Sequence, residues 1–376
     1  MKKAIYITLQ SLWPDINGGK KISLGRVLKL QETYDKVDCV VYNYANEDTK
    51  LLLTFLNDQN IELQEFTPIK NILPLYKRVW HYFISLLNGT SEATYYIAKD
   101  HFFCNEVNNM VSSLGKVDVY LDSIFLFPLV KYLNNNNCNI IFHNVESDFY
   151  SELSKCSPSF IKKIFYMSES IKIKKLEREI FNPLNDSKNI DLTFLSENDL
   201  STYRQKYENI VTKMNVNHNF IRCAFKLERK VSSELLFILF PGGMSFPPNN
   251  EGIKLFLDAY DAELEKKNIK LIITGSVNEV IRKSFFKYKS VQFSGLLSSE
   301  DLMELYASCL LVISPIFSGG GVKIKNIETI SYGVPLVATK FSCVGINVDS
   351  GLVYVTNNSI DDFCNVLSSV LNQDIN

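Results

Sequence analysis

Short apolar runs alternate along the chain with longer segments that have helical periodicity. The first series of apolar runs occupies residues 4–9, 37–42, 117–121, 139–143 and 191–196. A second series occupies residues 235–240, 269–274, 291–294, 310–314, 335–339 and 352–355. Because strands that alternate with helices are typical of βαβ units, the pattern predicts two doubly wound α/β domains, each built on a parallel sheet.

A polar and basic stretch, residues 222–233, separates the two series and has neither a strand period nor a helix period. It predicts a linker between an N-terminal Rossmann-like domain over residues 1–222 and a C-terminal one over residues 234–358. Apolar positions in the last stretch, residues 359–376, recur at helical spacing. We expect a terminal helix there that packs back toward the N-terminal domain.

Composition narrows the class of protein. With 376 residues, 46% of them apolar and 22% charged, the chain can bury two ordinary globular cores. A net charge of -1 argues against a nucleic-acid partner. No run of about 18 apolar residues is present, and the eight cysteines are scattered without metal-ligand spacing. We therefore expect a cytoplasmic protein with reduced thiols, no bound metal and no cofactor.

The most informative segment, residues 314–339, predicts a strand, a glycine-rich turn, a helix and a second strand. Three successive glycines, Gly319, Gly320 and Gly321, let the backbone approach a ligand closely. The helix that follows presents free N–H groups and the positive end of its dipole, which suits a diphosphate. Lys323 and Lys325 add positive charge there, and Glu328 lies one turn further on, where a ribose diol could bind its carboxylate.

Each of these residues has a plain structural alternative: a tight turn for the glycines, and an exposed helical ion pair for Lys325 and Glu328. Together, after one predicted strand and before the next, they favour ligand binding at the carboxyl ends of the strands.

The segment resembles the C-terminal motif of retaining glycosyltransferases of family 4, the glycosyl transferases group 1, which have the GT-B fold. Glu328 matches the second, ribose-binding glutamate of that motif, and residues 332–339 match its Gly-x-Pro-Val-Val-Ala-Thr tail. Gly320 occupies the place of the first glutamate, so backbone N–H groups of the glycine turn would have to replace it. The resemblance implies a GT-B chain with two Rossmann-like domains.

Two further C-terminal pieces fit this family. Residues 240–252 resemble its first strand-to-helix turn in the variant Gly-x-Met-Ser-x-x-Pro-Asn, which implies donor contacts from Gly242, Gly243 and Ser245. The usual Arg and Lys after this turn are missing, which shifts the diphosphate to Lys325 and Lys323. The turn at Leu297 resembles the one whose backbone contacts the nucleobase.

In the N-terminal half, Gly18 and Gly19 open a helix after the first strand. The alternatives there are an ordinary turn and a loop that closes over the donor phosphates. His143 follows a strand in a His-Asn-x-Glu segment, where the resemblance implies sugar binding or proton handling. Glu146 is a weaker candidate. Ser196 opens a Ser-Glu-x-Asp turn and is equally well interpreted as a helix N-cap.

Two stretches, residues 68–87 and 160–175, mix basic residues with aromatic and aliphatic ones. Such a mixture suits a membrane surface, and a core helix with solvated lysines explains it equally well.

The sequence thus predicts a hexosyltransferase that moves a sugar from a nucleotide diphosphate sugar to a glycan or lipid-linked glycan, with retention and without a metal. His143 and Lys325 are the predicted catalytic residues. We expect it in the cytoplasm, at the inner face of the membrane if the basic stretches bind lipid, in polysaccharide assembly. The alternatives are another GT-B enzyme, such as a nucleotide-sugar epimerase or an inverting transferase, and a non-catalytic nucleotide-sugar-binding protein.

Overall fold

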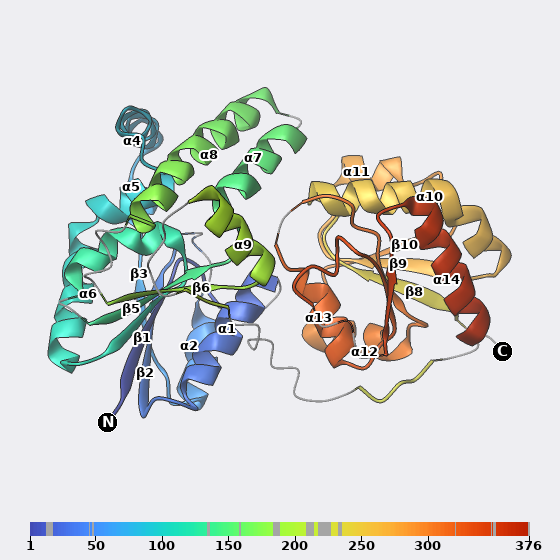
Figure 1. The fold of residues 1–376 in the computed structure, drawn as a ribbon, viewed down its shortest axis with the longest axis horizontal. Helices are drawn as coiled ribbons and strands as arrows, with labels where there is room; N and C mark the ends of the chain where they lie inside the picture. The colour runs from blue at the N-terminus through green and yellow to red at the C-terminus, as the bar shows by residue number, and fades with distance from the viewer. Residues whose placement is uncertain are drawn as a thin grey trace. The chain divides into compact units, whose positions relative to one another are not determined.

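The computed structural model describes residues 1–12, 18–44, 46, 49–133, 136–157, 159–182, 189–207, 214–216, 227–231, 235–319, 321–346, 348 and 351–374. The chain divides into two compact units, Met1–Phe220 and Ile221–Asn376. Each unit is a parallel sheet covered by helices (Figure 1). The predicted fold class, two Rossmann-like α/β domains, is confirmed.

The N-terminal unit is built on a parallel sheet in the order β3-β2-β1-β4-β5-β6-β7. Its strands are β1 (Lys3–Thr8), β2 (Lys36–Tyr42), β3 (Glu62–Phe66), β4 (Asp118–Leu121), β5 (Asn137–Phe142), β6 (Ile190–Phe194) and β7 (Met214–Val216). Its helices are α1 (Gly18–Leu30), α2 (Lys50–Asp58), α3 (Ile69–Ile72), α4 (Leu75–Asn88), α5 (Glu92–Lys99), α6 (His101–Leu114), the 3-10 helix η1 (Ile124–Tyr132), α7 (Glu146–Cys156), α8 (Phe160–Ile180) and α9 (Glu197–Lys206).

Alternation along β1 shows how this sheet fills two cores. Ala4 and Tyr6 join the core beneath α1 and α2, whereas Ile5 and Ile7 join the larger core on the other face. Successive side chains of a strand point to opposite faces, so a strand buried on both sides is apolar throughout. This explains why the central strands read as continuous apolar runs in the sequence.

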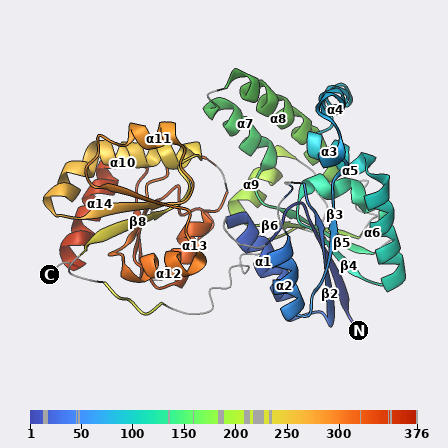
Figure 2. The same ribbon diagram turned by 180° about the vertical axis from the view of Figure 1, so that it is seen from behind.

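The C-terminal unit has a second parallel sheet in the order β10-β9-β8-β11-β12-β13. Helices lie on both sides of this sheet (Figure 2). Its strands are β8 (Phe237–Pro241), β9 (Lys270–Thr274), β10 (Val291–Gly295), β11 (Val312–Ser314), β12 (Leu336–Thr339) and β13 (Val353–Thr356). Its helices are α10 (Pro247–Lys266), α11 (Glu279–Ser284), α12 (Ser299–Ser308), α13 (Ile324–Ser331) and α14 (Ile360–Asp374).

The terminal helix α14 confirms the helix expected at the end of the chain. Its apolar side chains Phe363, Leu367, Val370 and Leu371 are buried in the core of the C-terminal unit, beside α10. The apolar face of α14 therefore completes its own unit, and the expected packing toward the N-terminal domain stays a prediction.

The linker predicted at residues 222–233 packs on the C-terminal unit over part of its length. Part of it, residues 222–226 and 232–233, lies outside the described residues. Residues 227–231 pack on the C-terminal unit, where the Arg229 guanidinium donates to the carbonyl oxygens of Tyr306, Cys309 and Leu310. These carbonyls lie at the end of α12, where a cation is favourable.

A bilayer-spanning helix is not found among the residues that the structure describes, because none of their helices is both long enough and apolar enough.

Candidate functional site

The candidate residues lie where the parallel strands of each unit end. In the N-terminal sheet, the carboxyl ends of β1, β4 and β5 lead to Thr8, Asp122 and His143. In the C-terminal sheet, the ends of β8 and β11 lead to the turn at Gly242 and to the glycine-rich loop. Strand order reverses at β1/β4 and at β8/β11, and ligands of open α/β sheets bind at such switch points.

Three turns of the C-terminal unit lie against one another at this edge. The N–H of Gly275, after β9, donates to the carbonyl of Gly295 at 2.7 Å. A side chain at Gly275 would lie 2.7 Å from the backbone nitrogen of Gly243, so the turns after β8 and β9 touch. The predicted donor residues Gly242, Gly243 and Leu297 are therefore on neighbouring turns, with Leu297 half-buried. Ser245, in the first turn, is exposed.

Helix α10 is held close to the loop that follows β11. A Cβ atom at Gly252 would lie 1.9 Å from the carbonyl oxygen of Pro315, so only glycine permits this approach. The contact fixes the start of α10, and with it Asn249, beside the glycine-rich loop.

Lys325, in the first turn of α13, has an ammonium group that is buried. Its Nζ donates to Oδ1 of Asn249 at 3.1 Å and lies 3.8 Å from the centre of the Phe240 ring. Asn249 in turn donates to the carbonyl of Gly243 at 2.9 Å. Burial lowers the pKa of Lys325 well below its usual value, and the charge of Lys323 lowers it further. The ammonium thus has neutral partners and a second cation nearby, a setting that an anionic ligand would stabilise.

The glycine-rich loop and Lys323 complete this cluster. Gly319 and Gly321 have φ angles of 94° and 72°, a conformation that glycine adopts without strain. Gly320 lies outside the described residues. Lys323 precedes α13, and its Nζ donates to the carbonyl of Gly321 at 3.0 Å. The start of α13 therefore combines helix N–H groups with two lysines, as the sequence predicts for a diphosphate site.

Glu328 is buried, with 7% of its surface exposed, on the same helix. Burial raises the pKa of the Tyr306 phenol of α12, and the negative charge of Glu328 raises it further, which indicates that the two side chains lie near each other. The structure thus places Glu328 next to the α12 side of α13, and its part in ribose binding stays a prediction.

The N-terminal unit holds a separate cluster around the buried carboxylate of Asp122. Its Oδ2 accepts hydrogen bonds from the hydroxyls of Ser23, at 2.5 Å, and Thr8, at 3.3 Å. Its Oδ1 accepts from Nη1 of Arg26 at 3.2 Å and lies 2.8 Å from Nε2 of His143. Burial would raise the pKa of Asp122, but His143, Arg26 and Ser23 together hold it below its ordinary value.

Asp122 sets the orientation of His143. An ionised carboxylate can only accept, so Nε2 of His143 carries the proton of this hydrogen bond and Nδ1 remains as the nitrogen that can take up another proton. Glu146, at the start of α7, lies near this imidazole, and burial raises its pKa to about 7 although His143 opposes the shift. This corner of the unit therefore places Glu146, a carboxyl with a raised pKa, beside the imidazole of His143.

Three other predicted residues can be placed in the N-terminal unit. Gly18 and Gly19 open α1, the helix that also carries Ser23 and Arg26. Ser196 caps α9, with its hydroxyl accepting from the N–H of Asp199 at 3.0 Å, so its interpretation as a helix cap is confirmed.

Sequence reasoning missed Asp122 and Asn249. Asp122 follows the predicted strand at residues 117–121, and this position at a strand end is the signal that could have indicated it. Asn249 is the last residue of the motif Gly-x-Met-Ser-x-x-Pro-Asn, but its contact with Lys325 joins positions 76 residues apart.

The C-terminal unit has a counterpart among known protein families. Residues 236–373 match the family model of the glycosyl transferases group 1. The C-terminal unit matches the group 1 glycosyltransferases. The resemblance drawn from the glycine-rich segment is thereby confirmed. This match covers both the glycine-rich loop and α13.

Two solved structures share the fold over almost the whole chain. WaaG, described as a glycosyltransferase involved in lipopolysaccharide biosynthesis, is 14% identical with a TM-score of 0.62, over 99% of this chain and 91% of WaaG. HepE of Anabaena, solved in complex with UDP and glucose, is 14% identical with a TM-score of 0.62, over 100% of this chain and 91% of HepE. At these identities the likeness shows a common GT-B fold.

A curated protein from Klebsiella pneumoniae, an uncharacterised 44.6 kDa protein in the cps region, is 25% identical over 243 residues. The match covers 62% of this chain and 60% of that protein.

A cluster of three or more His, Cys, Asp or Glu side chains placed to hold a metal ion is not found in the described part of the chain.

Proposed function

We propose that the chain is a retaining glycosyltransferase that moves a sugar from a nucleotide diphosphate sugar to a glycan acceptor. The reaction breaks the bond between the anomeric carbon and the diphosphate oxygen and joins that carbon to an acceptor hydroxyl, whose proton is released. Retention is supported by the family resemblance of residues 314–339. The match of residues 236–373 to the group 1 glycosyltransferases supports the reaction class.

The observation that carries this proposal is the environment of Lys325. Burial and the charge of Lys323 lower the pKa of Lys325, which means that its charged form is destabilised. A bound anion at the start of this helix would stabilise that charged form. A diphosphate leaving group brings this charge and becomes more negative as the glycosidic bond breaks. Lys325, Lys323 and the N–H groups of α13 would then stabilise the transition state more than the bound donor.

The Asp122 cluster supports a role on the sugar side of the reaction. His143, held through Nε2, would bind the donor sugar or exchange a proton at Nδ1, with Glu146 as the neighbouring acid or base. Gly18 and Gly19 would close over the phosphates, the backbone of Gly242, Gly243 and Leu297 would line the donor, and Glu328 would bind the ribose diol.

The transfer is proposed to proceed without a metal, because Lys323 and Lys325 supply positive charge where a cation would otherwise be needed. The complex of HepE with UDP and glucose makes a uridine diphosphate sugar the first donor to test. The cps-region relative and WaaG support a place in surface polysaccharide or glycoconjugate assembly. A glycan acceptor carried on a lipid would bring the enzyme to the inner face of a membrane, as a peripheral protein.

Thermal shifts with a panel of nucleoside diphosphates and their sugars identify the donor, since a ligand that binds the native state raises the unfolding temperature. NMR of the product then gives its anomeric configuration. Transfer with retention supports the proposal. An inverted product, an isomerised donor, or binding without hydrolysis or transfer would identify an inverting enzyme, an epimerase or a binding protein, respectively.

A further inference from the structure

Helix α4 has its polarity reversed with respect to an ordinary surface helix. Its large apolar side chains point away from the protein and are between 49% and 72% exposed: Leu75, Tyr76, Val79, Trp80, Phe83 and Leu87. They recur at helical spacing and so form one face. Ser85, on the other side, is buried, and Tyr82 is half-buried. A surface helix of a globular protein normally buries its apolar face and exposes its polar one.

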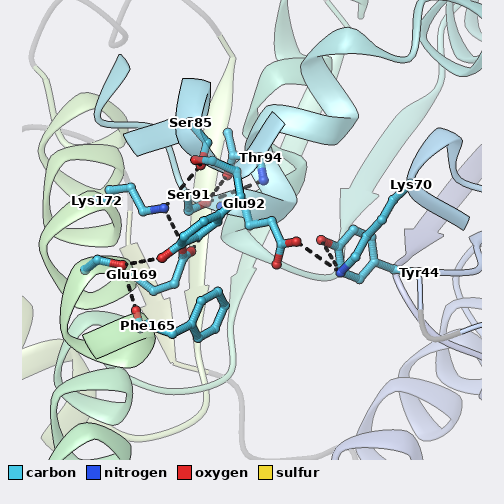
Figure 3. Close-up of polar contacts among 11 residues, drawn as sticks. Tyr44, Lys70, Ser85, Ser91, Glu92, Thr94, Phe165, Glu169 and Lys172 are labelled. Atoms are coloured by element: carbon cyan, nitrogen blue, oxygen red, sulfur yellow. Dashed lines mark hydrogen bonds and ion pairs between the residues drawn. The ribbon is translucent and has the colours of Figure 1, made fainter. Parts of the chain in front are cut away.

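Polar and aromatic contacts fix this orientation by attaching α4 to α8 (Figure 3). The Tyr82 hydroxyl lies 2.7 Å from that of Ser168, and its ring packs against Phe165. Lys172 of α8 donates to the Ser85 hydroxyl at 3.3 Å and lies over the Tyr82 ring. The inner side of α4 is therefore committed to α8, and its outer side has no described partner within the chain.

Lys172 is itself held in place, which makes the attachment firm. Its ammonium forms a buried ion pair with Glu169, and Glu169 also accepts a hydrogen bond from the N–H of Glu92 at 3.0 Å. The Glu92 side chain pairs with Lys70 at 3.4 Å (Figure 3). These contacts connect both ends of the segment that contains α4 to the body of the N-terminal unit.

The neighbouring helix α8 exposes further apolar side chains. Over residues 160–171 these are Phe160, Ile161, Ile164, Met167 and Ile171. Single exposed apolar residues are common, but rows of them on two adjoining helices indicate a surface that something else covers.

Exposed basic residues accompany both rows. On α4 these are Lys77 and Arg78, and α4 contains no acidic residue. On α8 they include Lys162, Lys163 and Lys174. Because the whole chain has a net charge of -1, this positive charge is a local feature.

We propose that the outer faces of α4 and α8 dock on an anionic lipid bilayer, with the aromatic and aliphatic side chains in the interface and the basic ones on lipid headgroups. Tryptophan and tyrosine favour the headgroup level, and lysine or arginine adds attraction to anionic lipid. A symmetric pair of two copies is disfavoured, since it would bring the same basic side chains together. This inference gives the peripheral membrane contact of the proposed function its surface and its partner.

Flotation of the full chain with vesicles tests the inference directly. Vesicles of phosphatidylcholine with about one third phosphatidylglycerol should carry the protein at low salt, and pure phosphatidylcholine or about 0.5 M salt should reduce this at least fivefold. The variant Trp80→Gln/Phe83→Gln should lower the partition coefficient about tenfold or more. Lys77→Glu/Arg78→Glu should lower it by a similar factor. Both pairs are exposed, so the fold does not depend on them.

Matched controls come from the C-terminal unit. Phe286 is 73% exposed and Lys283 is exposed as well, and Phe286→Gln and Lys283→Glu should bind vesicles as the native chain does. No binding to anionic vesicles at low salt, or an equal loss in the controls, would overturn the inference. A dimer in light scattering that Trp80→Gln/Phe83→Gln dissociates, without vesicle binding by the native chain, would assign the surface to a second copy.

Thermal shift by nucleoside diphosphates, measured on the same variants, separates this inference from the proposed function. The variants of α4 should keep the ligand shift of the native chain while they lose vesicle binding. Vesicle binding without any nucleotide shift would refute the proposed function and leave the docking surface standing.

Discussion

Replacing Lys325 with methionine should keep or raise the stability of the unliganded protein and lower the rate of sugar transfer. Methionine is unbranched and only one heavy atom shorter than lysine, so it can pack against the Phe240 ring, while it removes an ammonium whose pKa is lowered by burial. Replacing buried ionic groups with apolar ones of similar volume is often neutral or stabilising by roughly 1–4 kcal/mol. For a unit of about this size, 1 kcal/mol corresponds to about 2–4 °C, so the unfolding temperature without ligand should stay or rise.

The catalytic loss is expected in the chemical step. Removal of one preorganised donor costs about a hundredfold or more, or about 2.7 kcal/mol, which is two factors of ten at 1.36 kcal/mol each. The single-turnover rate of Lys325→Met should fall by this factor, and donor affinity should fall less. Lys323→Met is the matched control, because its ammonium binds a carbonyl of the loop, and it should lose less.

The pH dependence of stability provides an independent check. The pKa of Lys325 is lower in the folded protein than in the unfolded chain, so between the two values the unfolded chain binds more protons. Stability of the native chain should therefore rise relative to Lys325→Met as the pH increases toward about 10.4, the ordinary lysine value. A variant that keeps its single-turnover rate, a larger loss in Lys323→Met, or a variant destabilised by several degrees would refute the reasoning.

Three further predictions concern the other parts of the proposed site. Glu328→Ala should weaken nucleotide binding about tenfold in calorimetry if its carboxylate holds the ribose, a loss in the range of a hydrogen bond to a charged group; unchanged affinity would exclude this role. A chelator should leave the transfer rate within about twofold, and a strict need for magnesium or manganese would contradict transfer without a metal. Asp122→Asn should lower the transfer rate by at least about tenfold and change its pH profile, because His143 loses the carboxylate that fixes its tautomer. The same variant should lose roughly 3 kcal/mol of stability by denaturant unfolding, since Arg26 is left as a buried charge, and an unaltered pH profile would reduce Asp122 to a structural residue.

The strands of both sheets could be predicted well because those buried on two faces are continuous apolar runs. The exceptions are instructive. β3, with the sequence Glu-Leu-Gln-Glu-Phe, lies at an edge and has no such run, and β7 has only three residues. Their strand state depends on pairing with β2 and β6, which the local sequence does not contain.

The candidate site divides in the same way. The glycine-rich loop, Lys325 and His143 could be predicted because their motifs are contiguous. Asp122 has only its position at the end of a strand to indicate it, because its contacts with Thr8, Ser23 and His143 join three different segments. For α4 the sequence left two alternatives open, a membrane surface and a core helix. An apolar helical stripe looks the same in sequence whether it faces a core or solvent, and the contacts with α8 decide between them.

The close approach at Gly252 limits how this protein can be altered. The carbonyl of Pro315 occupies the place of a side chain, so even Gly252→Ala would act as a wedge between α10 and the end of β11. Such a wedge would displace the first turn of α10, which carries Asn249, and so disturb the hydrogen bond between Asn249 and Lys325. One methyl group on the side of α10 that faces Pro315 would therefore change the surroundings of Lys325 as surely as a substitution of Asn249 itself.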